Sequence, residues 1–113
     1  MYICGVLHII YSYYASDGVL YKYYDLWEDH VQKREKLLCK YPPSKPGETY
    51  YIPNGVRSIG YKAFDDCKYL KKVFIPSSVD DMDDIPLNIV CVVERGSYAE
   101  DYCKTNNLNF EYR

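Results

Sequence analysis

The chain has 113 residues, 48% of them hydrophobic and 27% charged, with a formal net charge of −2 at pH 7. A chain of this length is expected to form a single domain, 1–113, that buries roughly two-thirds of its unfolded surface. Because acidic and basic residues are interspersed and form no basic stripe, the composition argues against a nucleic-acid partner.

The N-terminal residues are interpreted as two strands joined by a turn. Residues 3–10 are apolar but too short to span a bilayer. No Lys or Arg precedes them, so they lack the charged start of a signal peptide. We therefore expect a buried strand within Tyr2–Tyr14, no integral membrane segment and no evident export signal. Asp17-Gly18 predicts a turn, and Val19–Tyr21 predicts a short strand.

Residues 24–41 are predicted to hold a helix followed by a strand. Several side chains recur at intervals of three and four, as on one face of a helix: Leu26, Trp27, His30, Val31, Arg34 and Leu38. Because Glu and Lys are also dense here, a helix from Leu26 to Lys36 is expected. Residues 37–41 return to a strand pattern, which Pro42-Pro43 ends.

One segment occurs twice with a shift of 23 positions. The residues Ile52-Pro53-Asn54-Gly55-Val56-Arg57-Ser58-Ile59 return as Ile75-Pro76-Ser77-Ser78-Val79-Asp80-Asp81-Met82. A fixed period in the twenties is typical of a solenoid, in which each unit buries its apolar face against the next. Residues 50–52 and 72–75 are predicted strands. Between them, apolar residues at three-residue intervals predict a helical or 3₁₀ return: Ala63-Phe64, Cys67 and Leu70.

The C-terminal part is predicted to be a strand, a helix and a closing strand. Ile89–Val93 is a continuous apolar run. Ser97, followed three residues later by Glu100, has the pattern of a capping box, in which each side chain accepts a hydrogen bond from the other's backbone N–H. A helix is therefore expected to begin after Ser97 and to end near Asn106-Asn107, with residues 108–112 as the last strand.

The spacing from Ile52 to Pro76 resembles the repeat of the BspA-like leucine-rich repeat proteins. The matching positions are Ile52-Pro53, Val56, Ile59, Ala63-Phe64, Cys67, Leu70, Val73 and Ile75-Pro76. Residues 17–42 resemble the variant unit that often precedes such repeats, and residues 96–102 are similar to the segment that often closes them. The resemblance extends over residues 13–112.

This resemblance implies an α/β repeat fold, namely a short leucine-rich-repeat solenoid with a parallel sheet, short helical returns and a C-terminal capping helix. Residues 1–48 would form an N-terminal variant unit with a helical insertion, 49–95 the repeat units and 96–113 the cap. It also implies a ligand-binding surface of bacterial cell-surface and adhesion proteins. A secreted or cell-surface location, no enzymatic activity and no cofactor follow from the same resemblance.

Strand alternation predicts the residues of a binding face. If Val73 points to the core, Lys72 and Phe74 point outward. The shift of 23 positions gives Thr49 and Tyr51 the same orientation, with Lys40 beside them if Tyr41 points inward. A pair of exposed aromatic rings can anchor a protein or glycan partner. The alternative is that Tyr51 and Phe74 only stabilise the sheet as a cross-strand pair.

The sequence contains no pattern that predicts catalysis or metal binding. It has no G-x-S-x-G, H-E-x-x-H or phosphate-loop motif. Asp80, Asp81, Asp83 and Asp84 lack the glycine and the distal Glu of a calcium loop and are interpreted as a solvated turn. The five cysteines, at 4, 39, 67, 91 and 103, are odd in number and form no C-x-x-C, and Cys4 with His8 does not complete a metal site.

Two functions therefore remain. The first is a non-catalytic binding module for a protein or glycan ligand. The second is a purely structural cap or remnant of a longer solenoid, which would self-associate as a homo-oligomer through exposed sheet edges.

Overall fold

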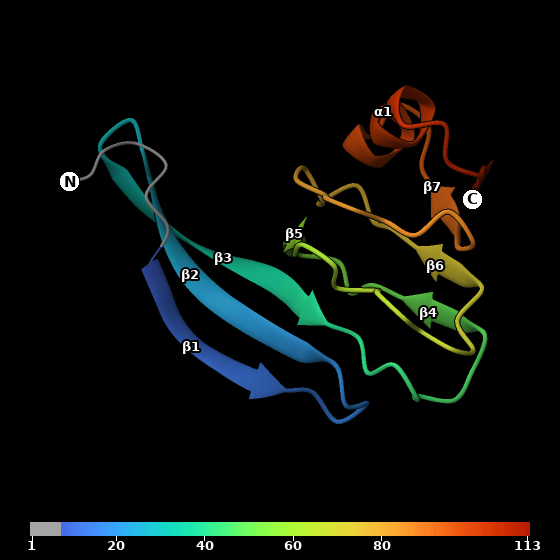
Figure 1. The fold of residues 1–113 in the computed structure, drawn as a ribbon. Coiled ribbons are helices and arrows are strands. Elements are labelled where there is room, and N and C mark those ends of the chain that lie inside the picture. Colours follow the sequence, from blue (N-terminus) through green and yellow to red (C-terminus); the bar gives the residue numbers. More distant parts are fainter. Residues whose placement is uncertain (1–7) are drawn as a thin grey trace.

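The computed structural model describes residues 8–113, which form two four-stranded sheets and one helix (Figure 1). The first sheet has the strand order β1-β2-β3-β5 and the second β4-β6-β7-β8. The strands of the first sheet are β1 (His8–Tyr14), β2 (Leu20–Glu28), β3 (Val31–Lys40) and β5 (Val56–Ile59). Those of the second are β4 (Thr49–Tyr51), β6 (Lys72–Phe74), β7 (Val90–Val93) and β8 (Phe110–Tyr112), and the helix is α1 (Tyr98–Thr105).

The predicted α/β solenoid is wrong, because the described chain is mostly β and its first sheet is mixed. β1, β2 and β3 pair antiparallel, and only β5 joins them in parallel. The predicted helical return between β5 and β6 is a series of turns. Lys62 and Asp66 have φ values of 57° and 55°, a left-handed conformation that an α-helix does not accommodate. The apolar residues of this segment still reach the core: Ala63, Phe64, Cys67 and Leu70 are all buried.

The predicted helix from Leu26 to Lys36 is also wrong, because this stretch forms the β2–β3 hairpin. Glu28 pairs with Val31, so a two-residue turn of Asp29 and His30 joins the strands. Both turn residues have positive φ, 49° and 64°, as a primed hairpin turn requires. Trp27 and Val31 in this stretch, and the tyrosines before it in β2, favour strands, and the long pairing of β2 with β3 outweighs the helical spacing.

The turn at His30 gives a first stability prediction. A left-handed conformation disfavours a residue with a side chain, whereas glycine adopts it readily. We expect His30→Gly to raise the thermal midpoint by about 2–5 °C and His30→Val to lower it. Differential scanning calorimetry of the two variants measures this. A lower midpoint for His30→Gly than for His30→Val would show that the turn has another conformation.

The second sheet is parallel throughout, and the sequence repeat sets the register of its first pair. Tyr51 pairs with Phe74, and Thr49 with Lys72, in each case 23 positions apart. β6 then pairs with β7, and β7 with β8. Ile52 continues the ladder by donating its N–H to the Phe74 carbonyl at 3.0 Å. The two matching segments therefore lie side by side, although the larger fold around them is not the predicted one.

One continuous hydrophobic core connects the two sheets. It contains Tyr21 and Leu38 from the first sheet, Val73 and Cys91 from the second, and Cys103 from α1. The predicted capping box of α1 is confirmed in part: Ser97 caps the helix, but the Glu100 side chain accepts from the N–H of Gly96 rather than from that of Ser97. The Ser97 Oγ accepts a hydrogen bond from the Glu100 N–H at 3.2 Å, and the Glu100 carboxylate accepts one from the Gly96 N–H at 2.8 Å. Asn106 is the C-cap of the helix, at the predicted end.

Candidate functional site

A row of side chains crosses the outer face of the second sheet. Tyr51 on β4 pairs with Phe74 on β6, which pairs with Val92 on β7. Tyr50 and Val73, their neighbours in the chain, are buried in the core. Because successive side chains of a strand point to opposite faces, this burial turns Tyr51 and Phe74 outward. We call Tyr51, Phe74 and Val92 the aromatic row.

The two rings of the aromatic row are stacked. Their centroids are 4.1 Å apart and their planes differ by 16°. The side chain of Tyr51 is 60% exposed, and that of Phe74 is half-buried. Val92 is buried but lies outside the core cluster, so its neighbours on the outer face cover it. The aromatic row therefore presents one exposed side chain, Tyr51, beside a half-buried ring, Phe74, and a buried residue, Val92.

Charged side chains surround the aromatic row in opposite-sign pairs. The Lys72 Nζ lies 3.1 Å from a carboxylate oxygen of Glu111, and an Arg113 nitrogen lies 3.9 Å from one of Glu94. The Arg113 guanidinium also lies 5.5 Å from the centroid of the Phe74 ring. Exposed ion pairs such as these add at most about 1 kcal/mol to stability. Their main effect is to place polar groups of both signs around an apolar centre.

The structure brings together four of the five predicted site residues. Thr49 and Lys72 pair with each other two residues before Tyr51 and Phe74 along the strands, so all four lie on the same face. Lys40 does not join them. It ends β3 in the first sheet, where it pairs with Leu20. There its charge partly offsets the rise that burial causes in the pKa of the Cys67 thiol.

Sequence reasoning missed Val92, Glu111 and Arg113. Ile89–Val93 is a continuous apolar run, so its sequence does not indicate which residues face outward. β7 aligns with β6 at a shift of 18 positions rather than 23, as in the pair of Phe74 with Val92. The period of the repeat therefore does not extend to this strand, and only the structure shows which residues continue the row.

Among residues 8–113, no group of three or more His, Cys, Asp or Glu side chains is placed to hold a metal ion. Of the Cys4 and His8 pair considered above, Cys4 lies outside the described residues. Cys67, Cys91 and Cys103 are buried free thiols, and Cys39 is a partly buried one. Within the described range, no helix has the length and apolar character needed to cross a membrane.

No protein-family model matches the sequence, and no curated protein matches it. Among solved structures, the chain is similar to a leucine rich cell surface protein from Faecalibacterium prausnitzii A2-165. The sequence identity is 28% and the TM-score is 0.55. The similarity covers 74% of this chain and 21% of that protein, so the chain spans about a fifth of its length. The chain thus resembles, in sequence and in fold, part of a leucine-rich cell-surface protein.

Proposed function

We propose that this chain is a non-catalytic module of a cell-surface protein, related to the BspA-like leucine-rich repeat proteins, that binds a protein or glycan through its aromatic row. The observation that carries the proposal is the stacking of Tyr51 with Phe74, in which Tyr51 is 60% exposed. The similarity to a leucine-rich cell-surface protein supports the location.

The aromatic row has the composition of a binding hot spot. Binding energy in interfaces concentrates in a few aromatic or Arg residues inside a polar rim. Here the Tyr51 ring is stacked against the Phe74 ring on the neighbouring strand, so binding orders few additional torsions and costs little entropy. The ion pair of Lys72 with Glu111 supplies part of the rim. Tyr51 is 60% exposed, so it retains surface that a partner can cover.

Replacing Tyr51 with alanine tests this proposal. We expect Tyr51→Ala to weaken binding to immobilised mucin glycoprotein, which presents both polypeptide and glycans, by about tenfold or more. Tyr61→Ala is a matched control, because Tyr61 is also exposed, at 66%, and lies outside the aromatic row. Surface plasmon resonance measures both affinities. Equal affinities for the two variants, or no binding by the unmodified chain to mucin or to a glycan array, would contradict the proposal.

A second candidate function is structural self-association. β1 is an edge strand of the first sheet, and none of its seven residues is Asp, Glu, Lys or Arg. No other strand within residues 8–113 pairs with its outer side. Uncharged edge strands of this length tend to pair with another chain. Sedimentation velocity over a hundredfold concentration range distinguishes the binding function from the structural one. A chain that stays monomeric at all concentrations and still binds mucin contradicts a purely structural role.

A further inference from the structure

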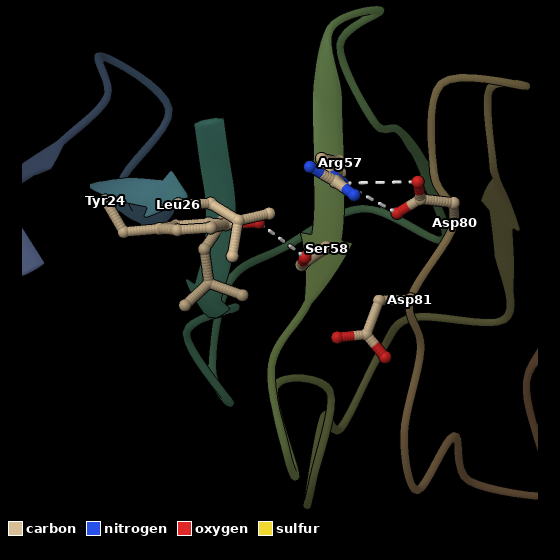
Figure 2. A pocket seen from close by; sticks show the side chains of 7 residues that line it. Tyr24, Leu26, Arg57, Ser58, Asp80 and Asp81 are labelled. Atoms are coloured by element: carbon tan, nitrogen blue, oxygen red, sulfur yellow. Dashed lines mark hydrogen bonds and ion pairs between the residues drawn. The ribbon is translucent and has the colours of Figure 1, made fainter. Parts of the chain in front are cut away.

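We propose that a pocket on the first sheet binds one neutral pyranose sugar, free or at the end of a glycan. The pocket lies between β2, β3 and β5 and the segment that carries Asp80 and Asp81, and its volume is about 370 Å³ (Figure 2). Small-molecule sites in proteins typically measure about 300–1,000 Å³. None of its lining residues belongs to the aromatic row, so this inference is independent of the function proposed above.

Among residues 8–113, the two buried hydroxyl groups on the floor of the pocket carry one hydrogen more than their mutual hydrogen bond uses. The Tyr24 hydroxyl and the Ser58 Oγ are 3.0 Å apart and share one hydrogen bond. Both residues are more than nine-tenths buried, with 4% and 6% exposed. Two hydroxyl groups carry two hydrogens, and the bond between them uses one. Within residues 8–113, neither hydroxyl has a further hydrogen-bond partner. Buried donors normally have an acceptor, so this floor is complementary to a ligand oxygen.

Beside Ser58, at the exposed rim of the pocket, lies the carboxylate of Asp81, which has no hydrogen-bond or ion-pair partner among residues 8–113. Asp81 forms a parallel bridge with Ser58, and its carbonyl accepts a hydrogen bond from the Ile59 N–H at 2.9 Å, so its backbone is held in place. Its side chain makes no hydrogen bond or ion pair with any other residue of the described range. Figure 2 shows the carboxylate directed into the space beside Ser58. Burial, and then the charges of Asp80 and Asp83, raise the pKa of Asp81, so a donor from a ligand would stabilise its ionised form.

Two further walls complete the pocket. Arg57 is held rigidly, because its Nε lies 3.1 and 3.2 Å from the two carboxylate oxygens of Asp80 and its Nη1 lies 3.0 Å from Glu35. On the other side, Leu26 and Leu37 provide apolar surface. The pocket therefore combines an apolar wall, a donor on its floor and an acceptor at its rim.

A pyranose matches all three features. Its ring carbons and hydrogens can pack on Leu26 and Leu37, one hydroxyl can accept from the floor, and another can donate to Asp81. Anionic ligands such as phosphate or sugar acids fit poorly, because Asp80 and Glu35 already neutralise Arg57 and Asp81 adds a negative charge. An alkylammonium ion would satisfy Asp81, but it has no lone pair for the buried hydroxyl hydrogen.

The inference is tested by titrating the full chain with glucose, galactose and mannose. Amide chemical shifts in ¹H–¹⁵N spectra report the binding. We expect at least one hexose to shift the amides of Ser58 and Asp81 with a Kd on the order of a few mM. Asp81→Ala is expected to weaken this binding about tenfold or more, since a charged acceptor is lost. The fold should be unaffected, because the Asp81 side chain makes no hydrogen bond or ion pair with the part of the chain that the structure describes. Asp83→Ala, which removes a neighbouring acid that does not line the pocket, is the matched control and should bind as the unmodified chain does.

Three results would overturn the inference. They are the absence of saturable shifts with every hexose at 100 times the expected Kd, saturation by n-butylammonium but by no hexose, and equal hexose affinity for Asp81→Ala and Asp83→Ala. The Tyr51→Ala variant separates the two sites. If the aromatic row is not a binding face, hexose binding in the pocket is unchanged. If the pocket binds no hexose, Tyr51→Ala still weakens binding to mucin.

Discussion

Replacement of Phe64 with alanine is expected to lower the free energy of unfolding by about 3–5 kcal/mol. The Phe64 side chain is 2% exposed, and its ring centroid lies 5.6 Å from that of Tyr41, which follows β3. Tyr41 in turn meets Tyr50 of β4 edge to face at 5.2 Å. Phe64 thus lies where the turns after β5 pack on both sheets. Its truncation leaves a cavity there that the surrounding strands cannot easily fill.

Urea denaturation followed by circular dichroism measures this effect. Because a domain of this size is stable by about 5–15 kcal/mol, Phe64→Leu serves as a milder variant in case the alanine variant does not fold. Tyr61→Ala is again the control and should change the unfolding free energy by less than about 0.5 kcal/mol. A loss below about 1 kcal/mol for Phe64→Ala would show that the non-helical turn segment is not part of the core.

Removal of the Tyr50 hydroxyl is expected to cost about 1–3 kcal/mol. This hydroxyl donates to an Asp17 carboxylate oxygen at 3.0 Å and shares a second hydrogen bond with the Tyr21 hydroxyl. The Tyr21 side chain is only 1% exposed. Tyr50→Phe keeps the ring but leaves the Tyr21 hydroxyl buried without this partner, which is the costly part of the change. A double-mutant cycle with Tyr21→Phe isolates the pairwise contribution.

The same two hydroxyls predict a dependence of stability on alkaline pH. Burial raises the pKa of Tyr21 to about 12, and burial followed by the bond to Tyr21 raises that of Tyr50. A raised pKa in the folded state gives stability that is present below the ordinary value of 10 and is lost as the pH rises through about 12. The decline of the urea midpoint between pH 10 and pH 12 should be shallower for the Tyr21→Phe/Tyr50→Phe variant. Equal declines would contradict this account of the pair.

The sequence predicted local features better than long-range ones. The shift of 23 positions between β4 and β6 was visible because the same side chains recur, and the capping box was visible because its two residues lie three apart. The β2–β3 hairpin was missed because its turn contains no glycine. Asp29 and His30 adopt positive φ under the constraint of the strand pairing, which no local pattern shows.

The pocket on the first sheet could not have been predicted in the same way. Tyr24, Ser58 and Asp81 come from three distant parts of the chain, and their proximity depends on the parallel pairing of β5 with β3. From sequence, Asp81 was one member of an acidic run interpreted as a solvated turn. Its charge was evident, but its position beside a buried hydroxyl pair was not.

The stack of Tyr51 on Phe74 can be tested directly by nuclear Overhauser spectroscopy. The two ring centroids lie 4.1 Å apart, so the account predicts cross-peaks between the ring protons of these two residues. It also predicts backbone contacts typical of parallel pairing between Tyr50 and Val73. Backbone contacts in an antiparallel pattern, or rings without mutual cross-peaks, would contradict the proposed binding face.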